Sequence, residues 1–390
     1  MWPFDRALLN WSNPALRAVI YQALALIAVI TLFAYFISTA HQNLQRLHIT
    51  TGFDFLGNTA GFGIIQTLVP YTEESSYGRA FLVGLVNTLV VAGVGIFFAT
   101  LLGFIIGIAR LSTNWLIATL ATIYVETLRN TPVLLQLFFW YFAILRPLPT
   151  PAQSLEPLPG VFLNNRGIVM PLPILQPSAL VFFGALALAL VFAYGLHRWA
   201  LARRLATGQD FPSWAVGVAA ILLLPGLVWI IWGAPLHLAF AEQGNFDLKG
   251  GLRLLPEFVA LTLGLSLYTA AFIAEIVRAG ILSVSKGQSE AAYALGLKPG
   301  QTLRFVVIPQ SMRLIIPPLT SQLLNLTKNS SLAVAIGYPD LVAVFAGTVL
   351  NQTGQAIEVI TITMAVYLVL SLVTSALMNI YNARAALRER

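Results

Sequence analysis

The chain has 390 residues, of which 58% are hydrophobic and only 9% are charged. A soluble protein of this length needs a polar surface, and globular domains carry roughly 25% charged residues. The net charge of +7 comes from Lys and Arg residues scattered between apolar runs, which excludes the clustered basic face that binds nucleic acid. Because the chain contains no cysteine and its four histidines lie far apart, we expect no disulfide and no metal site. The composition predicts a membrane protein.

Eight apolar segments are long enough to cross a bilayer as helices, since a hydrocarbon core about 30 Å thick needs ~20 helical residues. The predicted spans are residues 18–38, 81–109, 115–145, 178–197, 213–232, 257–281, 312–336 and 357–381. The first is longer than the roughly 7–15 apolar residues of a secretory signal, so we interpret it as a retained helix. The second contains Gly103 and Gly107 at a spacing typical of helix packing. The sequence thus predicts an all-α, polytopic bundle of about eight transmembrane helices.

The loops between the spans differ in charge and composition. Most of the Lys and Arg residues lie on one side of the membrane if both termini are cytoplasmic, as the positive-inside rule requires. Two segments on the opposite side, residues 39–80 and 146–177, are rich in glycine and proline respectively. We predict that both are irregular loops, which cap the outer mouth, contact a partner or simply connect spans.

The predicted cytoplasmic loop of residues 286–309 has the pattern of two short helices. Ser289 is expected to cap the first helix, and Gly296 is expected to end it. Pro299 suits the first turn of a second helix, and Pro309 suits the entry into the next span. The small residues of this loop would let another protein approach closely. An amphipathic surface helix without a partner is the alternative from composition alone.

The same loop resembles the EAA motif in the permeases of bacterial ATP-binding-cassette (ABC) importers. The positions that match the motif are Glu290, Ala291, Ala292, Gly296, Val306, Ile308 and Pro309. Further stretches, at residues 87–89, 124–136, 274–280 and 325–332, are similar to the histidine and polar-amino-acid permeases. The resemblance implies a type I importer core. It also implies that Glu290, Ala291, Ala292 and Gly296 couple the permease to a separate ATPase.

The resemblance further implies the transport of L-amino acids into the cytoplasm by alternating access, in the inner membrane. The implied partners are membrane lipid, a second homologous permease in a heterodimer, an ATPase dimer that uses ATP and Mg²⁺, and a periplasmic amino-acid-binding protein. This chain contains no G-x-x-x-x-G-K-[ST] loop, so we expect it to bind no cofactor and to be no enzyme by itself. An ion-coupled secondary transporter and a non-transporting structural subunit stay open as alternatives.

The family core covers only part of the chain. We expect it at residues 81–145 and 257–381, with additions at 1–80 (one extra helix), 146–256 (two extra helices) and 382–390 (a cytoplasmic tail). This extended layout is similar to the larger permease subunit of general L-amino-acid importers.

Glu126 and Arg129 are ionisable residues near the middle of the third predicted span, three positions apart and therefore on one helical face. A charge at the bilayer centre costs ~2.5–3.5 kcal/mol on insertion scales, and residues at this depth are commonly functional. In one interpretation Arg129 binds the substrate carboxylate, while Glu126 orients Arg129 or binds the ammonium group. In the other, the two form a buried pair that only fixes helix packing.

Polar residues in other spans complete the predicted site. We predict that the substrate path contains Glu126, Arg129, Thr131, Gln136, Asn325, Lys328 and Ser330. For the polar stretch of the seventh span, hydrogen bonding to the partner permease is the alternative. Glu275 and Arg278, near the cytoplasmic end of the sixth span, are expected to form an ion pair that steadies the gate or the coupling loop.

Overall fold

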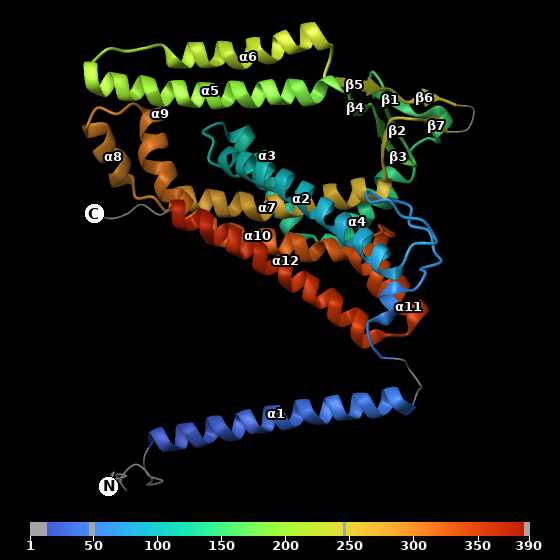
Figure 1. Cartoon of the computed structure of the whole chain (residues 1–390). Coiled ribbons are helices and arrows are strands. Elements are labelled where there is room, and N and C mark those ends of the chain that lie inside the picture. The colour runs from blue at the N-terminus through green and yellow to red at the C-terminus, as the bar shows by residue number, and fades with distance from the viewer. Residues whose placement is uncertain (1–13, 47–50, 245–246, 386–390) are drawn as a thin grey trace. The chain divides into compact units, whose positions relative to one another are not determined.

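The computed structural model describes residues 14–46, 51–244 and 247–385, and it is mostly helical (Figure 1). Within that part of the chain, six helices are long and apolar enough to cross a membrane, or up to seven if a bent pair counts as one span. The six are α1 (Pro14–Arg46), α2 (Tyr77–Ala109), α5 (Ser178–Thr207), α6 (Ser213–Trp232), α7 (Pro256–Leu282) and α12 (Ala356–Ala385). The prediction of a polytopic helical membrane protein is confirmed.

The bent pair consists of α3 (Trp115–Asn130) and the helical segment Val133–Leu145, which meet at 107°. The second segment comprises α4 (Val133–Phe138) and the π-helical η3 (Phe139–Leu145). The sequence predicted one continuous span over residues 115–145, and that continuity is wrong. A proline ring disfavours a helical conformation in the residue before it. Thr131, which precedes Pro132, accordingly takes an extended conformation.

The predicted span at 312–336 is also helical, but it is not among the helices apolar enough to cross a membrane. It consists of α10 (Ile308–Asn329) and the 3₁₀ helix η6 (Ser330–Ile336). Polar residues such as Gln322, Asn325 and Lys328 lower its hydropathy. By this criterion the described residues support six or seven spans rather than eight.

The chain divides into two compact units, residues 1–90 with 339–390 and residues 91–338. In the first unit, the segment between α1 and α2 is folded rather than irregular near its start, where η2 (Asp54–Gly57) buries Phe55. The Phe55 ring stacks on Phe345 of η7 (Val342–Val349), which α11 (Leu350–Thr353) follows. The Gly52 amide donates to Glu358 Oε1 at 2.8 Å. These contacts fix residues 51–57 against the helices of their own unit.

A network of polar groups joins α2 to the turn before η7 in the first unit. Asn87 Nδ2 donates to the Pro339 carbonyl at 2.9 Å, and Thr88 Oγ1 accepts from the Leu341 amide at 3.0 Å. Asp340 is fully buried, and its Oδ1 accepts from the Ala343 amide at 2.8 Å at the start of the helix. The side chain therefore caps the helical stretch that begins at Leu341 and continues as η7, because its carboxylate accepts from an amide that has no partner within the helix.

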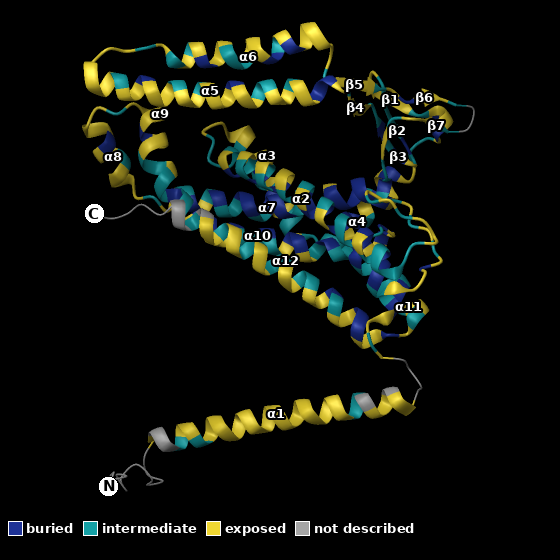
Figure 2. Ribbon diagram, in the orientation of Figure 1, coloured by how far each residue is buried: buried dark blue, intermediate teal, exposed yellow. Residues whose placement is uncertain are grey.

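The second unit is built around α7, in which Figure 2 shows the buried residues concentrated. The α2 backbone approaches α7 closely at two glycines. A Cβ added to Gly103 would lie 2.5 Å from Ile273 Cβ, and one added to Gly107 would lie 2.7 Å from the Ala274 carbonyl oxygen. No larger residue fits at either position without a shift, so the interpretation of this pair as a helix-packing motif is confirmed.

The prediction that residues 146–177 form an irregular loop is wrong. Three small antiparallel sheets occur in the described part of residues 146–256, with the strand orders β1-β2-β3-β8, β4-β5 and β6-β7. The strands are β1 (Leu155–Leu158), β2 (Val161–Asn164), β3 (Gly167–Met170), β4 (Leu172–Leu175), β5 (Leu236–Ala239), β6 (Glu242–Gln243), β7 (Leu248–Lys249) and β8 (Leu252–Leu254). A 3₁₀ turn, η4 (Pro151–Gln153), precedes them. Pro157 and Pro173 lie in strands with a free edge, where a missing amide donor is tolerated.

Helices α5 and α6 form a hairpin between β4 and β5, and they run side by side in Figure 1. Gly208 ends α5 in the left-handed conformation, with φ of +71°. Because β4 pairs with β5, the two ends of the hairpin meet, and the Gln176 amide donates to the Pro235 carbonyl at 3.0 Å. Most side chains of the hairpin are exposed.

Candidate translocation and coupling site

Glu275 of α7 lies at the centre of a group of ion pairs in the second unit. Its Oε1 accepts from Arg278 at 2.8 Å, and its Oε2 pairs with Arg110 at the end of α2. Arg129 Nη1 of α3 lies 3.9 Å from the same Oε2. Glu126 Oε1 lies 3.9 Å from Arg110 Nη2. We call these five residues the Glu275 cluster.

The Glu275 cluster combines three arginines with two glutamates, which leaves an excess of one positive charge. Arg110 is the most enclosed member, since its side chain is 9% exposed while that of Glu126 is 56% exposed. Arg129 is loosely held, because 3.9 Å is beyond hydrogen-bonding distance and its Nε has no partner among the described residues. Its guanidinium lies 5.3 Å from the ring centre of Phe272. Arg129 can therefore bind an anion without losing a strong ion pair.

The structure separates two residues that the sequence placed together. Glu126 pairs with Arg110, while Arg129 pairs with Glu275. The structure therefore does not support the alternative in which Glu126 and Arg129 pair with each other. Both residues lie near the end of α3 rather than in the middle of a span, because the helix stops at Asn130. Arg110 is not among the site residues that the sequence predicted.

Gln136 and Thr131 hold the break between α3 and α4. Gln136 is buried, and its Nε2 donates to the carbonyl oxygens of Leu128 at 2.9 Å and Thr131 at 3.0 Å. The Thr131 hydroxyl donates to the Thr127 carbonyl at 2.8 Å. Carbonyls at the end of a helix have no intrahelical donor, so Gln136 replaces the hydrogen bonds that the break removes. Their place in the substrate path stays a prediction.

The polar residues of α10 divide into an exposed and a buried set. Asn325 and Lys328 are exposed and lie three positions apart, on one face of the helix. Ser330 is fully buried and donates to the Thr327 carbonyl at 2.7 Å. Among the ion pairs of the described residues, none joins Lys328 to the Glu275 cluster. Among the described residues of one chain, no ion pair therefore connects the α10 part of the predicted path to the Glu275 cluster.

The predicted coupling loop forms α8 (Lys286–Ala294), α9 (Pro299–Thr302) and the π-helical η5 (Leu303–Val307). Gly296 follows α8 with φ of +77°, a left-handed backbone that ends a helix. Pro299 occupies the first turn of α9, as predicted. The predicted cap is wrong, because α8 begins three residues before Ser289, which lies inside the helix.

The exposed face of the coupling loop mixes charged, small and apolar residues. Glu290, Ala291 and Gly296 are exposed, whereas Ala292 is buried. Leu295 is 83% exposed at the end of α8. A leucine held at the tip of a short surface helix is available to a partner protein.

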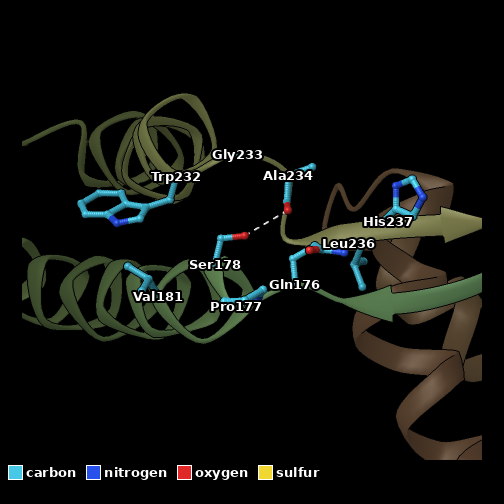
Figure 3. A pocket seen from close by; sticks show the side chains of 9 residues that line it. All are labelled: Gln176, Pro177, Ser178, Val181, Trp232, Gly233, Ala234, Leu236 and His237. Carbon is cyan, nitrogen blue, oxygen red and sulfur yellow. Dashed lines mark hydrogen bonds between the residues drawn. The ribbon is translucent and has the colours of Figure 1, made fainter.

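A separate cleft of about 730 Å³ lies where α5 begins and α6 ends (Figure 3). In Figure 3, Ser178 points across the cleft, and its hydroxyl donates to the Ala234 carbonyl at 3.0 Å. The cleft is lined by Gln176, Pro177, Ser178, Val181, Trp232, Gly233, Ala234, Leu236 and His237. None of the predicted site residues is among them. Within the described residues, no group of three His, Asp or Glu side chains could hold a metal ion.

The protein is helical and has several candidate membrane spans, a broken span beside an ion cluster and an exposed pair of surface helices. This is the architecture of a membrane transport component. Residues 99–387 match the family described as "Binding-protein-dependent transport system inner membrane component". The chain belongs to this family of permease subunits. It is an inner-membrane component rather than the catalytic subunit of such a system.

Three relatives resemble the chain over nearly its full length. YhdX of Escherichia coli (strain K12), provisionally named an amino-acid ABC transporter permease, is 52% identical over 98% of this chain and 97% of its own. AapQ of Rhizobium johnstonii, a general L-amino acid transport system permease, is 50% identical over 100% and 96% respectively. BztB of Rhodobacter capsulatus, a glutamate/glutamine/aspartate/asparagine transport system permease, is 40% identical over 96% and 95%.

Proposed function

We propose that this chain is a permease subunit of an ABC importer that moves L-amino acids into the cytoplasm by alternating access. The names of its full-length relatives support amino acids as the substrate class. The single observation that carries the proposal is the connection between coupling loop and ion cluster. One turn of α7 and a three-residue link join Arg278 to α8.

In this proposal, the partner ATPase holds α8 and α9 and uses ATP with Mg²⁺. Closure of the ATPase moves the coupling loop, and α7 transmits the movement to the Glu275 cluster. Helix α7 is suited to this role because it is buried along most of its length and runs without a break from Pro256 to Leu282. The exposed Leu295 and the open surface at Gly296 support contact with a partner at this loop.

Arg129 is proposed to bind the substrate carboxylate. The excess positive charge of the Glu275 cluster and the weak 3.9 Å contact of Arg129 favour an added anion. Glu126 is the exposed acidic member of the cluster and is available to the substrate ammonium group. Thr131, Gln136, Asn325, Lys328 and Ser330 are proposed to line the remaining path.

The remaining partners follow from the same mechanism. A periplasmic binding protein delivers the amino acid, and a second, homologous permease completes the path that one chain leaves open. The exposed Asn325 and Lys328 on α10 face either that path or the second permease. The distribution of Lys and Arg supports a cytoplasmic position for both termini. Residues 1–13 and 386–390 lie outside the described residues.

Uptake by the reconstituted complex tests this proposal. Arg129→Ala removes a charge-assisted hydrogen bond of about 1.5–3 kcal/mol, so we expect amino-acid uptake to fall roughly 10- to 150-fold with normal assembly. Arg203→Ala, which changes an arginine of the α5–α6 hairpin, is the matched control. Vanadate should block wild-type uptake, whereas an ion-coupled transporter would be insensitive. Uptake at the wild-type rate in Arg129→Ala would remove Arg129 from the mechanism.

A further inference from the structure

The guanidinium of Arg129, in the last turn of α3, lies over the ring of Phe272 in α7, 5.3 Å from the ring centre. The described residues contain three other contacts of this kind, and each pairs an arginine with a ring nearby in the chain. The contact between Arg129 and Phe272 instead joins two helices that are far apart in the sequence. It therefore results from the packing of α3 against α7 and not from local chain geometry.

Two further contacts hold the ring of Phe272 and the helix that carries Arg129. The rings of Phe272 and Tyr268, which lie one turn apart on α7, have centres 4.9 Å apart. The Tyr124 hydroxyl of α3 donates to the Leu267 carbonyl of α7 at 2.8 Å. Because this hydrogen bond joins the two helices beside the aromatic pair, the Phe272 ring is held opposite the last turn of α3.

Glu275 gives Arg129 only a loose contact. The two carboxylate oxygens of Glu275 already accept from Arg278 and Arg110, which lie closer to them than Arg129 does. Arg129 Nη1 is 3.9 Å from this carboxylate, and Arg129 Nε has no hydrogen-bond partner among the described residues. The face of an aromatic ring attracts a guanidinium electrostatically and needs none of its N–H donors. Phe272 can therefore hold the charge of Arg129 and leave these donors to a ligand.

We propose that Phe272 is a positioning residue for transport, whose ring holds the Arg129 guanidinium ready for the substrate carboxylate. This role rests on the proposed function, in which Arg129 binds that carboxylate. An arginine held by one long ion pair moves among several rotamers, and ordering it on binding reduces the affinity for the substrate. A ring that already restrains the guanidinium removes part of this cost. The Arg129 side chain is 34% exposed, so a carboxylate can reach it.

Fluorination of the Phe272 ring tests this electrostatic contact with little change of shape. Fluorine withdraws electrons from the ring face, so each added fluorine weakens the attraction for a cation. Amber suppression introduces mono-, di- or trifluorinated phenylalanine at this position of the complete transporter. The uptake of a mixture of radiolabelled L-amino acids is then measured in proteoliposomes with the binding protein. We expect the uptake rate to fall with each fluorine, to about five-fold below the wild type with three.

Phe258 provides the matched control for Phe272. It lies on the same helix, and none of the arginine–aromatic contacts of the described residues involves its ring. The same fluorinated analogues at Phe258 should leave uptake unchanged. In Arg129→Ala, three fluorines at Phe272 should cause no further loss, because the guanidinium on which the ring acts is absent.

Three results would overturn the proposal, and they separate it from the proposed function. Equal uptake across the Phe272 series, in a transporter that loses uptake in Arg129→Ala, would remove the role of Phe272 alone. The same loss from three fluorines with and without Arg129 would show that the ring acts only through packing. Uptake at the wild-type rate in Arg129→Ala would remove both the role of Phe272 and the proposed contact of Arg129 with the substrate.

Discussion

Arg110 depends on Glu275 for the balance of its charge. Its side chain is 9% exposed, and its other anionic neighbour, Glu126, lies 3.9 Å away. Glu275→Gln leaves an enclosed guanidinium beside a neutral amide, so we expect the free energy of unfolding to fall by about 3 kcal/mol. Thermal unfolding of the purified protein, followed by tryptophan fluorescence, measures this loss.

The control for Glu275 is Glu126→Gln, which removes an acidic partner of the same arginine. The Glu126 side chain is 56% exposed and its contact is long, so we expect a loss below about 1 kcal/mol. Equal losses in the two variants would contradict the assignment of Glu275 as the centre of the cluster.

The buried carboxyl group of Asp340 should make the stability of the folded protein depend on pH. Burial raises the pKa of its carboxyl group from 3.8 to about 7, although hydrogen bonds from nearby amides oppose this rise. Because the folded chain binds the proton more tightly, this carboxyl favours folding most below pH 3.8, and that contribution is lost as the pH rises to about 7. Asp340→Asn should remove this component, while still capping η7. Thermal unfolding between about pH 5 and 8 measures the difference.

Asp54→Asn is the control for Asp340, because Asp54 is an exposed carboxylate of the same unit. It should leave the pH profile of stability unchanged. The same profile in the wild type and in Asp340→Asn would show that the buried carboxyl does not titrate in this range.

The sequence was sufficient to select four members of the Glu275 cluster, because ionisable residues are rare in apolar spans. It could not assign their partners. Which glutamate faces which arginine depends on how α3 packs against α7, and spacing along one helix does not determine contacts between helices. Arg110 was not predicted as a site residue, because the positive-inside rule already explains an arginine at the end of a span.

At the scale of single elements, Gly296 determines how α8 ends. Its φ of +77° strains any residue with a Cβ, although a Cβ there would meet no atom within 4 Å. Gly296→Ala should therefore cost roughly 1 kcal/mol locally, loosen the turn after α8 and uncouple ATP hydrolysis from uptake. The ratio of ATP hydrolysed to amino acid imported is the measurement, and we expect it to rise several-fold.

Gly300 provides the matched control for Gly296. It lies four residues further along the same loop, also in open space, but without a positive φ. Gly300→Ala should leave the coupling ratio unchanged. If both variants couple normally, the conformation of the turn after α8 does not matter for contact with the ATPase.

Long apolar runs were the most reliable signal for whole elements, since six predicted spans correspond to single helices in the described residues. Shorter elements were harder. The strands β2 and β3 carry the apolar residues of a hairpin, but the surrounding prolines favoured an irregular loop. The break at Pro132 was visible in the sequence, yet its angle depends on the contacts of α3, α4 and η3 with α7, which lie far away in the chain.

At the scale of the whole molecule, the α5–α6 hairpin contributes two candidate spans whose outer ends lie together. The α5–α6 hairpin leaves the sheet at β4 and returns at β5, so it adds an even number of crossings. Its helices pack chiefly against each other. We therefore expect the rest of the second unit to tolerate removal of the hairpin.

Replacement of residues 176–235 by an Asn-Gly turn tests this independence. The register of β4 and β5 already pairs Leu175 with Leu236, and a two-residue turn of this type connects such strands directly. We expect the shortened chain to assemble, to keep its unfolding temperature within a few degrees and to retain uptake, because the Glu275 cluster and α8 lie outside the deletion. Loss of assembly with the second permease would show instead that the exposed faces of α5 and α6 are a subunit interface.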